Sequence, residues 1–378
     1  MPPSSKERDK ISIIEARMEV FQNVGEVPSP IYLGRSVTDL LEETIHEHEF
    51  DHLFVVTDEV VGRIHGNALG DALPKGEHQF IKFPEGEASK SLANFEQLVK
   101  RVLDAGITKR SIILAFGGGV VGNVAGFLAG TLFRGIRFAH IPTTFQAQTD
   151  SVLSRKQALN CQAKNIIGCF HTPLFTFIDT AFLETEPDRY LISGVAESIK
   201  NAVISDETFY NHLIENLSEK MLHDPEGLHE LVLRSILTKL AILQRDPSEQ
   251  DEALILEYGH TLAHALETLA DGALTHGECV SIGMVFNARL SCMLGLLPKE
   301  QENDARSLLE RIGLPTCIPA AISSDRLIET MRFDNKRRGH EVEFVLLEAT
   351  CRPHFTPTGY CRPVEETVVA ECMEACRA

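Results

Sequence analysis

The chain has 378 residues, which is enough for two domains or one large one with a buried core. Hydrophobic residues make up 43% and charged residues 24%, as in soluble globular proteins. The net charge of −18 argues against a nucleic-acid-binding protein, which needs a basic face, but it allows a phosphorylated small molecule held by a few local cations.

The segment from Ser4 to Lys10 is polar and charged, so it does not predict a secretory signal. The most apolar run, Val120 to Phe133, is interrupted by Asn123 and is too short to cross a bilayer. The nine cysteines are scattered without a Cys-x-x-Cys pair, which is typical of thiols in a reducing compartment. We therefore expect a cytoplasmic protein.

The first half of the chain predicts strands alternating with helices. Short apolar runs predict buried parallel strands at Leu53–Thr57, Gln79–Phe83, Ser111–Phe116, Ile136–Ile141 and Phe175–Ile178, and a further short strand is expected near Ile11–Met18. Helices are expected from about Glu59, from Ser91 to Ala105 and after Gly122. This alternation predicts a doubly wound parallel sheet.

Three glycines, Gly117-Gly118-Gly119, lie between an expected strand and an apolar helix. Such a turn leaves backbone N–H groups bare at a helix N-terminus, where a pyrophosphate binds. The spacing differs from Gly-x-Gly-x-x-Gly, so the usual dinucleotide fingerprint is absent. Two interpretations stay open, a phosphate-binding loop and a tight structural turn.

The stretch from Asp150 to Asn165 is interpreted as a polar loop. It carries hydroxyls, amides and cations at Asp150, Ser151, Ser154, Arg155, Lys156, Asn160, Lys164 and Asn165. A cluster of this kind can hold a phosphate and sugar hydroxyls, and the alternative is a loop that is only solvated.

From about Pro187 the apolar residues follow a helical period, which predicts a second domain and a boundary near residue 185. The expected helices are Arg189–Ile204, Thr208–Met221, Gly227–Gln244, Ala253–Leu269, His276–Leu294, Lys299–Ile312 and Asp325–Arg332. The tail predicts a strand at Val342–Leu347, paired near His354–Thr356, and a last helix at Val364–Cys376.

His260 and His264 are four residues apart, which places both imidazoles on one face of a helix, and His276 follows after a turn. Imidazole is a common metal ligand, so the span indicates a site for zinc or a similar ion. No Glu lies between the first two histidines to act as a base, so a carboxylate must come from elsewhere. Glu197, placed among apolar residues, is the candidate. The alternative is capping histidines and an exposed helical Glu.

These motifs occur in an order that resembles the sugar phosphate cyclases, the dehydroquinate synthase superfamily, from about residue 53 to 340. The motifs are Gly117–Val120, Pro142–Thr144, Asp150–Lys156, Lys164-Asn165, Gly194–Lys200, Gly259–His264 and His276–Glu278. The resemblance implies a dehydroquinate synthase-like fold, with an N-terminal Rossmann-like α/β domain that binds NAD (residues 1–185) and a C-terminal mainly helical domain that binds metal and substrate (residues 186–378). It also implies an active site in the cleft between them, one divalent ion (Zn²⁺ or Co²⁺) and a homodimer.

Within this family, the runs Asp150–Asn160, Glu257–His260 and Asp334–Arg337 are similar to the branch that acts on glucose 6-phosphate. Ala253 stands where dehydroquinate synthases carry an Arg that contacts the substrate carboxylate, and glucose 6-phosphate has no carboxylate. The resemblance implies a carbon–oxygen lyase that converts D-glucose 6-phosphate to 2-deoxy-scyllo-inosose and phosphate, the first step of 2-deoxystreptamine aminoglycoside biosynthesis. The implied steps are transient oxidation at C4 by NAD⁺, phosphate elimination, re-reduction, ring opening and an intramolecular aldol reaction.

The resemblance also implies site residues. The metal ligands would be Glu197, His260 and His276, and the catalytic groups Lys156, Glu249, Glu257 and His264. Substrate contacts would come from Arg134, Asp150, Lys156, Asn165, Lys200, Lys239 and Lys336. NAD contacts would come from Asp58, Glu87, Lys90, Gly118, Gly119, Asn123, Thr143, Thr144, Lys164, Phe182 and Thr185, with Asn123 in place of the family's more common Asp.

Three alternatives are kept. The first is another sugar phosphate cyclase, such as a 3-dehydroquinate synthase or a valiolone-type synthase. The second is a metal-dependent polyol dehydrogenase, which shares the two-domain plan. The third is a catalytically inactive relative with a binding or regulatory role. The partners expected are a small sugar phosphate and a second copy of the chain, without nucleic acid or membrane.

Overall fold

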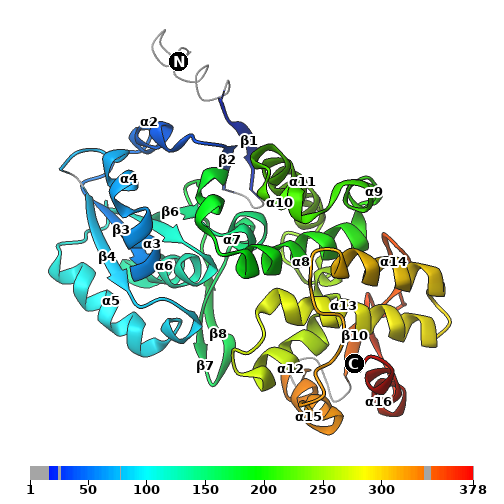
Figure 1. Cartoon of the computed structure of the whole chain (residues 1–378). Helices are drawn as coiled ribbons and strands as arrows, with labels where there is room; N and C mark the ends of the chain where they lie inside the picture. The colour runs from blue at the N-terminus through cyan, green and yellow to red at the C-terminus, as the bar shows by residue number, and fades with distance from the viewer. Residues whose placement is uncertain (1–16, 24–26, 77, 336–341, 378) are drawn as a thin grey trace. The chain divides into compact units, whose positions relative to one another are not determined.

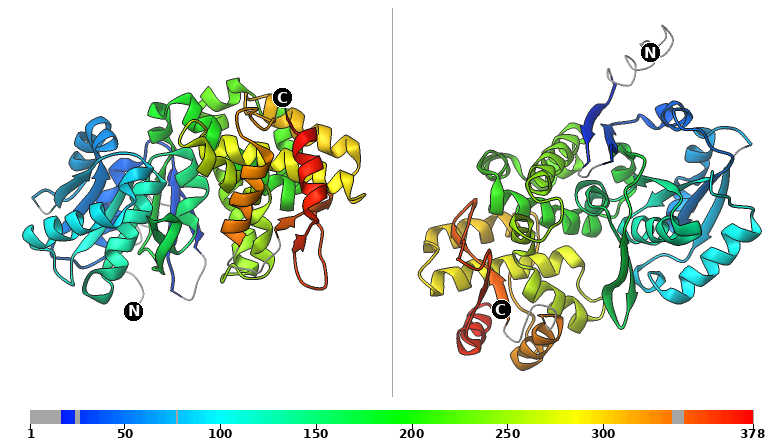
Figure 2. Two further views of the ribbon diagram at one scale, coloured as in Figure 1. Left: turned by 90° about the horizontal axis from the view of Figure 1, so that it is seen from below. Right: turned by 180° about the vertical axis from the view of Figure 1, so that it is seen from behind.

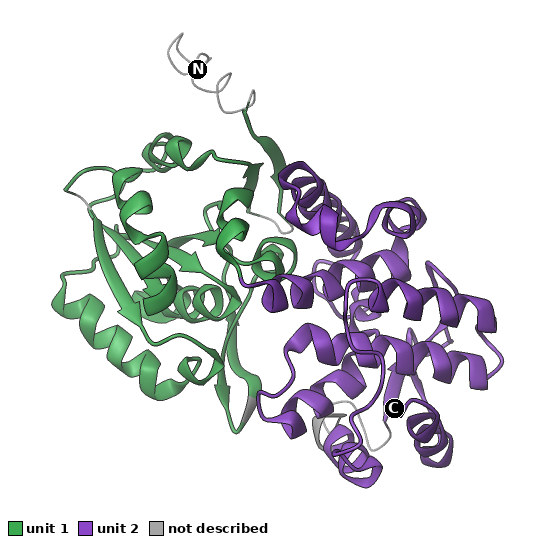
Figure 3. Cartoon of the chain, viewed as in Figure 1, with its two compact units in different colours: residues 1–186 green, residues 187–378 purple. Residues whose placement is uncertain are grey.

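The computed structural model describes residues 17–23, 27–76, 78–335 and 342–377 (Figure 1). The chain forms two compact units, residues 1–186 and residues 187–378 (Figure 3). The first unit is an α/β structure built on a mostly parallel sheet, and the second is mainly helical, so the predicted fold class is confirmed. None of the helices described is both long enough and apolar enough to cross a membrane.

A seven-stranded sheet forms the first unit, with the strand order β1-β2-β9-β6-β5-β3-β4. Only β1 runs antiparallel to its neighbour, and the other pairs are parallel. The strands are β1 Glu19–Gln22, β2 Pro30–Gly34, β3 Leu53–Asp58, β4 His78–Phe83, β5 Ile112–Gly117, β6 Arg137–Pro142 and β9 Thr176–Asp179. Most of the strand predicted near residues 11–18 lies outside the described residues, and β2 was not predicted.

Helices cover both faces of this sheet because alternate residues of its central strands are apolar on both sides. Leu53 and Val55 of β3 pack in one core, while Phe54 and Val56 pack in another. Helices α2 Leu41–His46 and α4 Gly66–Asp71 contribute to the first core, and α5 Leu92–Asp104 and α6 Gly119–Thr131 to the second (Figures 1 and 2). The short helices α3 Glu59–Ile64 and α7 Phe145–Thr149 follow the ends of β3 and β6.

The polar stretch predicted as a loop is a β-hairpin instead. Strands β7 Lys156–Cys161 and β8 Ala163–Phe170 pair antiparallel around a turn at Gln162, whose φ is 61°. The hairpin is joined to α6 through Asn123, whose Oδ1 accepts the N–H of Ala158 at 3.0 Å. Strand β7 is therefore fixed by a long-range contact with α6, and its sequence has no clear apolar alternation.

The second unit is a set of helices around α13. These helices are α8 Asp188–Ser205, α9 Glu207–Asn216, α10 Glu219–His223, α11 Pro225–Arg245, α12 His260–Ala270, α13 His276–Met293, α14 Lys299–Glu310, α15 Ser324–Asn335 and α16 Glu366–Ala375. Helix α13 packs against α8, α12, α14 and α16, and most of its residues are buried.

Two helices predicted as continuous are interrupted in this unit. The segment predicted from Thr208 to Met221 divides into α9 and α10, because Ser218 caps a new helix by accepting the N–H of Met221. The segment predicted from Ala253 to Leu269 divides into a 3-10 helix, η6 Glu252–Glu257, and α12. Gly259 separates them with a φ of 80°, a left-handed conformation that ends a helix.

The C-terminal tail forms two small sheets. Strand β10 Glu343–Val345 pairs with β13 Cys361–Pro363, and β11 Leu347–Ala349 pairs with β12 Arg352–Pro353. The partner predicted for this region, His354–Thr356, was therefore wrong by a few residues for β11 and missed β13. The short loops here carry little periodic signal.

Asp179, at the end of β9, binds the segment that follows β2. Asp179→Ala should lower the free energy of unfolding by about 3 kcal/mol or more. The buried carboxylate accepts backbone N–H groups of Ser36, Val37 and Thr38 at 2.7–3.0 Å and the Thr38 hydroxyl at 2.7 Å. The substitution would leave the buried N–H of Val37 and the part-buried donors of Ser36 and Thr38 without this acceptor. Urea denaturation measures the loss.

The exposed pair between Arg17 and Asp39 supplies the control for this experiment. Asp39→Asn should change the free energy of unfolding by less than about 1 kcal/mol, since exposed ion pairs contribute little. Equal losses in the two variants would contradict the role given to Asp179.

Candidate active site

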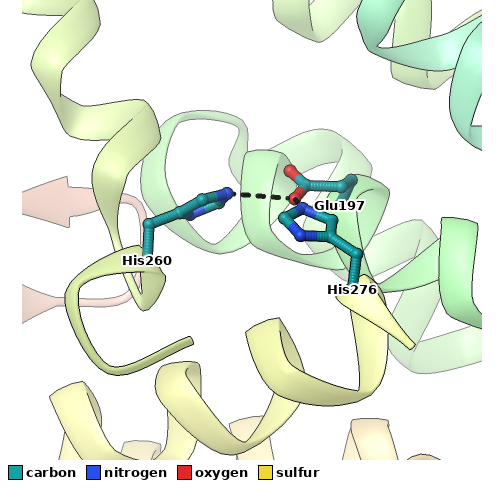
Figure 4. Close-up of side chains that lie close together, drawn as sticks. All are labelled: Glu197, His260 and His276. Carbon is teal, nitrogen blue, oxygen red and sulfur yellow. Dashed lines mark hydrogen bonds and ion pairs between the residues drawn. The ribbon is translucent and has the colours of Figure 1, made fainter. Parts of the chain in front are cut away.

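Three potential metal ligands from separate helices meet in the second unit (Figure 4). Glu197 lies in α8, His260 is the first residue of α12, and His276 is the first residue of α13. Nε2 of His260 is 3.2 Å from Oε1 of Glu197, and Nε2 of His276 is 3.1 Å from the same oxygen. The carboxylate is buried, while the His260 and His276 side chains are 12% and 25% exposed. One side of the cluster therefore stays accessible.

The donor set fits a zinc-like ion. All three donor atoms lie within 4.8 Å of one another. Ligand atoms about 2.1 Å from a tetrahedral ion are separated by about 3.4 Å, which is close to the 3.2 and 3.1 Å between Oε1 of Glu197 and the two histidine nitrogens. Two imidazole nitrogens and one carboxylate oxygen leave at least one coordination position for a substrate oxygen, as in catalytic zinc sites. The residues present thus suit a single divalent ion of the zinc or cobalt type.

Close helix packing at two glycines brings His260 toward α13. A Cβ at Gly283 of α13 would lie 2.0 Å from the carbonyl oxygen of Gly259, and a Cβ at Gly259 would lie 2.9 Å from the N atom of Met284. Only glycine at both positions allows the two backbones to approach this closely. The break before α12 therefore sets where His260 begins its helix.

A second close contact places His276 beside α8. Gly277 donates its N–H to Oγ of Ser193 at 3.0 Å, and a Cβ at Gly277 would lie 1.8 Å from the Ser193 carbonyl oxygen. The turn is capped by Thr275 and Glu278, which form a reciprocal capping box. Arg189 of α8 binds Glu278 through two hydrogen bonds of 2.9 and 2.8 Å. The first turn of α13 is therefore bound to α8 at Ser193, which lies one helical turn before Glu197.

Lys200 balances the buried carboxylate of Glu197. Its Nζ is 2.6 Å from Oε2 of Glu197, and both side chains are almost fully buried. Burial raises the pKa of Glu197, but Lys200 and the two histidines outweigh it and hold the pKa well below its usual range. Glu197 is therefore an anion, the form that binds a cation.

The second nitrogen of each histidine has its own partner. Nδ1 of His260 lies 3.2 Å from the Tyr258 carbonyl oxygen, and Nδ1 of His276 lies 3.5 Å from Oε2 of Glu267. Burial and the Lys200 ammonium lower the pKa of His260. Burial also lowers the pKa of His276, but Glu197 and Glu267 raise it to about 10. A carbonyl or carboxylate at Nδ1 leaves Nε2 directed at the metal position.

Other predicted residues of the second unit lie on the same group of helices. His264 lies one turn after His260, with the ring centroids 5.4 Å apart. Glu257 ends η6, and Lys239 is 7% exposed on α11. Glu249 has a φ of 53° in the loop after α11, where Asp246 accepts the N–H groups of Asp251 and Ala253. Lys336 lies outside the described residues.

The predicted phosphate-binding turn lies at the carboxyl end of β5. Helix α6 begins after Gly118, and this N-cap residue has no side chain to cap the first N–H groups of the helix. A Cβ at Gly118 would lie 3.2 Å from the Thr144 side chain, and one at Gly119 would lie 3.2 Å from Oγ of Ser151. This is the edge of a parallel sheet where nucleotides bind in doubly wound folds. The geometry suits a pyrophosphate.

Some of the predicted cofactor residues of the first unit also have a structural role. Asp58 caps α3 by accepting the N–H of Val61 at 2.8 Å, and Thr144 caps α7. Asn123 donates to the Gly119 carbonyl oxygen as well as accepting from β7. Oγ1 of Thr185 and Nε2 of His65 form a hydrogen bond of 2.7 Å. The ring of His65 also contacts the ring of Phe182 edge-on. The other predicted residues are Thr143 after β6, Arg134 at the end of the 3-10 helix η3 Leu132–Arg134, Asp150 after α7, and Glu87, Lys90, Lys156, Lys164 and Asn165 around the hairpin.

Comparison with known families accounts for this combination of units. Residues 80–193 match the family model 3-dehydroquinate synthase N-terminal, and residues 194–337 match 3-dehydroquinate synthase C-terminal. The chain belongs to the 3-dehydroquinate synthase family. The dehydroquinate synthase-like fold predicted from the motifs is therefore confirmed.

Within the family, the chain is similar to two kinds of cyclase. It is 38% identical to the 2-deoxy-scyllo-inosose synthase of Micromonospora echinospora, over 85% of this chain and 81% of that one. It is 35% identical to the 3-dehydroquinate synthase of Thermoanaerobacter pseudethanolicus, over 86% and 93%. A crystal structure of 2-deoxy-scyllo-inosose synthase complexed with carbaglucose-6-phosphate, NAD⁺ and Co²⁺ superposes with a TM-score of 0.87 at 31% identity, covering 94% of this chain and 100% of that one.

Several residues around the site were not predicted from the sequence. Ser193 and Glu267 act through contacts between helices, and Asp246 acts within the loop after α11. The carbonyl of Tyr258 belongs to the backbone, so the residue type gives no signal of this contact. The one cue for Glu267 was its place three residues after His264, a spacing that places the two on neighbouring positions of one helix face.

Glu267→Gln should weaken metal binding by this family member about 10- to 100-fold, because loss of an outer carboxylate partner has that effect at histidine-ligated sites. The helix should stay folded, since glutamine is a good helix former. Titration calorimetry of the metal-free protein with Co²⁺ measures the affinity. Glu300→Gln, on the exposed first turn of α14, is the matched control. Equal Co²⁺ affinities in the two variants would show that Glu267 does not support the metal site.

Proposed function

We propose that this protein converts D-glucose 6-phosphate to 2-deoxy-scyllo-inosose with release of phosphate, using NAD⁺ catalytically and one divalent metal ion. The observation that carries the proposal is the cluster of Glu197, His260 and His276 in a chain of this family. The similarity to 2-deoxy-scyllo-inosose synthases, at 33–38% identity over most of the chain, supports this substrate. The reaction is a carbon–oxygen lyase reaction, because phosphate leaves by elimination.

Ala253 favours glucose 6-phosphate over a carboxylated substrate. Its side chain is 3% exposed, and its N–H is held by Asp246 at 3.1 Å. Dehydroquinate synthases resemble this chain but carry an Arg at the position, which pairs with a carboxylate. A methyl group offers no cation there, so a heptulosonate would lose a charge-assisted contact. A neutral sugar ring loses nothing.

In the second unit, Glu197, His260 and His276 would hold the metal ion. A bound divalent ion supplies Lewis acidity, which fixes sugar hydroxyls and makes one of them more acidic. Lys200 keeps Glu197 ionised, and it would also contact the substrate. His264, Glu249 and Glu257 would exchange protons with the sugar, and Lys239 would add a contact.

In the first unit, the N-terminus of α6 after Gly118 would bind the cofactor pyrophosphate. A bound NAD⁺ supplies a transient hydride acceptor, which the reaction regenerates. Residues already described would complete this site, with Asp58 at the adenosine ribose, Glu87, Lys90, Asn123, Thr143, Thr144, Lys164, Phe182 and Thr185. Arg134 and Lys156 would hold the phosphate that leaves, while Asp150 and Asn165 would contact sugar hydroxyls. Cations at a leaving phosphate stabilise the developing charge.

A substrate panel tests the proposal. Purified protein with NAD⁺ and Co²⁺ or Zn²⁺ receives glucose 6-phosphate, sedoheptulose 7-phosphate or the carboxylated heptulosonate phosphate. We expect phosphate release from glucose 6-phosphate alone, without net NADH. Release from the heptulosonate would establish a 3-dehydroquinate synthase, the second candidate, which the 35% identity to such an enzyme favours. Stoichiometric NADH without phosphate would indicate a polyol dehydrogenase.

The wider biological setting follows from the same proposal. We infer a role in aminoglycoside antibiotic biosynthesis, because 2-deoxy-scyllo-inosose is the carbocycle from which 2-deoxystreptamine is built. A homodimer and a cytoplasmic location are inferred from the family resemblance and from the composition. Light scattering during gel filtration measures the mass in solution, and a mass of 41.9 kDa would contradict the dimer.

A further inference from the structure

The hairpin β7–β8 is tied to the loop that precedes α5. The N–H of Asn160 in β7 donates to the carbonyl oxygen of Lys90 at 2.8 Å, and Ser91 and Asn160 form an isolated parallel bridge. The loop includes the short 3-10 helix η2 Glu87–Ser89. Two segments far apart in the sequence are therefore joined at the hairpin.

The side chain of Asn160 uses both of its ends in this junction. Its Nδ2 donates to Oε1 of Glu87 at 2.7 Å, and its Oδ1 accepts the N–H of Asn165 at 3.0 Å. An amide is the side chain that can donate and accept in opposite directions at once. Asn160 is half-buried, and both of its side-chain bonds lie at the exposed side of the junction.

Lys90 closes these bonds into a ring. Its Nζ donates to Oδ1 of Asn165, and its carbonyl oxygen accepts the N–H of Asn160. Lys90 is only 6% exposed, so its ammonium needs acceptors within the protein, and Oδ1 of Asn165 is one of them. Asn165 has a φ of 55°, a conformation that asparagine tolerates better than most residues. The ring Glu87–Asn160–Asn165–Lys90 thus fixes the backbone of the hairpin near its turn.

The ring contains residues from both proposed ligand sites, the NAD⁺ site and the sugar phosphate site. Glu87 and Lys90 belong to the NAD⁺ contacts, and Asn165 belongs to the substrate contacts, so this inference rests on the proposed function. Asn160 belongs to neither set. A ligand that contacts Glu87 and Lys90 favours the closed ring, and the closed ring is the arrangement that sets the backbone of Asn165.

We propose that Asn160 is a positioning residue that couples the binding of NAD⁺ to the binding of the sugar phosphate. The coupling is reciprocal, because each ligand stabilises the same closed arrangement. NAD⁺ tightens the binding of the sugar phosphate, and the sugar phosphate tightens the binding of NAD⁺ by the same factor. Asn160→Ala removes both side-chain bonds while leaving the backbone bond to Lys90, so it opens the ring without deleting a ligand contact.

Titration calorimetry of the metal-loaded protein tests the coupling. The dissociation constant of NAD⁺ is measured with and without carbaglucose 6-phosphate, a substrate analogue that keeps the phosphate. The wild-type ratio is expected to lie between about 5 and 150, and the ratio in Asn160→Ala is expected to fall to about 1. Gln162→Asn, at the exposed turn of the same hairpin, is the control and keeps the wild-type ratio.

Asn160→Asp provides a second variant with a more conservative shape. It keeps the acceptor for Asn165 but places a carboxylate against Glu87, so it also loses the coupling. Thermal unfolding of all variants is followed by circular dichroism. A variant that weakens both ligands and lowers the melting temperature, but keeps the wild-type ratio, would show a merely structural role and overturn the inference.

The proposed function and this inference fail in different ways. A wild-type protein that releases phosphate from glucose 6-phosphate, but binds the two ligands independently, overturns the coupling and leaves the function intact. A wild-type protein that binds neither NAD⁺ nor the analogue overturns both.

Discussion

Replacing Glu197 by glutamine is expected to abolish metal binding and cyclase activity together. The neutral amide removes the one anionic ligand and leaves two imidazoles facing an uncharged group. A bound metal ion contributes several kcal/mol of transition-state stabilisation, and each ~1.4 kcal/mol is tenfold in rate. We therefore expect kcat/KM to fall by about 10³-fold or more. Metal content after dialysis and phosphate release are the two measurements.

The same substitution should also lower stability in the metal-free protein. Lys200 is almost fully buried and is 2.6 Å from the Glu197 carboxylate. Removing one partner of a buried ion pair costs about 3–5 kcal/mol, because the other charge stays buried without compensation. Urea denaturation of the apo-protein measures this loss.

Glu230→Gln is the matched control for both measurements. Glu230 makes a partly exposed surface pair with Arg234 on α11, and surface pairs contribute less than about 1 kcal/mol. The control should therefore keep its metal, its activity and its stability. An inactive Glu197→Gln variant that still binds one Co²⁺ per chain with wild-type affinity would show that Glu197 is not a ligand.

Gly277→Ala is expected to weaken metal binding and activity, although Gly277 is not a metal ligand. The new Cβ would lie 1.8 Å from the Ser193 carbonyl oxygen, so the start of α13 must move away from α8. His276 is the preceding residue and moves with it, while Glu197 stays on α8. A misplacement of about 1 Å in a catalytic arrangement can cost about 10²-fold in rate. We expect a loss of that size in kcat/KM and a matching loss of Co²⁺ affinity.

Overpacking of this kind also costs about 1–3 kcal/mol in the free energy of unfolding. Gly66→Ala, in α4, is the control because its Cβ would meet nothing closer than 3.9 Å. That variant should be unchanged or more stable by up to about 1 kcal/mol, since alanine restricts the unfolded chain. A Gly277→Ala protein with normal Co²⁺ affinity would mean that the contact with Ser193 does not position His276.

The central strands were predictable because their apolar pattern is local. In β3 and β5 the residues are buried on both faces, so each appears in the sequence as a continuous apolar run. Strand β2 gave no such signal, since only Ile31, Tyr32 and Leu33 lie between a proline and a glycine. Its pairing with β9 is a long-range contact that local patterns do not record.

The hairpin and the break before α12 show what local patterns miss. Strand β7 contains few apolar residues and is fixed by Asn123 and by the ring through Asn160. The helix predicted over 253–269 had a suitable period, but the packing of Gly259 on Gly283 requires a left-handed residue there. In both cases tertiary contacts outweigh propensity.

The sequence predicted Glu197, His260 and His276 as ligands because they occur in a family order, and the structure places their donor atoms side by side. It did not predict what holds them there. The hydroxyl of Ser193, the carbonyl of Tyr258 and the carboxylate of Glu267 act only in the folded arrangement. The contacts of Ser193 and Glu267 depend on packing between helices, and a backbone carbonyl gives no signal in the residue type, so these groups leave no motif.

The most direct test of the proposed reaction uses glucose 6-phosphate labelled with ¹³C at both C1 and C6. Carbocyclisation joins these two carbons, so NMR of the product formed with NAD⁺ and Co²⁺ should show a new one-bond carbon–carbon coupling and no net NADH. A product without that coupling, or NADH accumulating in step with substrate loss, would contradict the assignment.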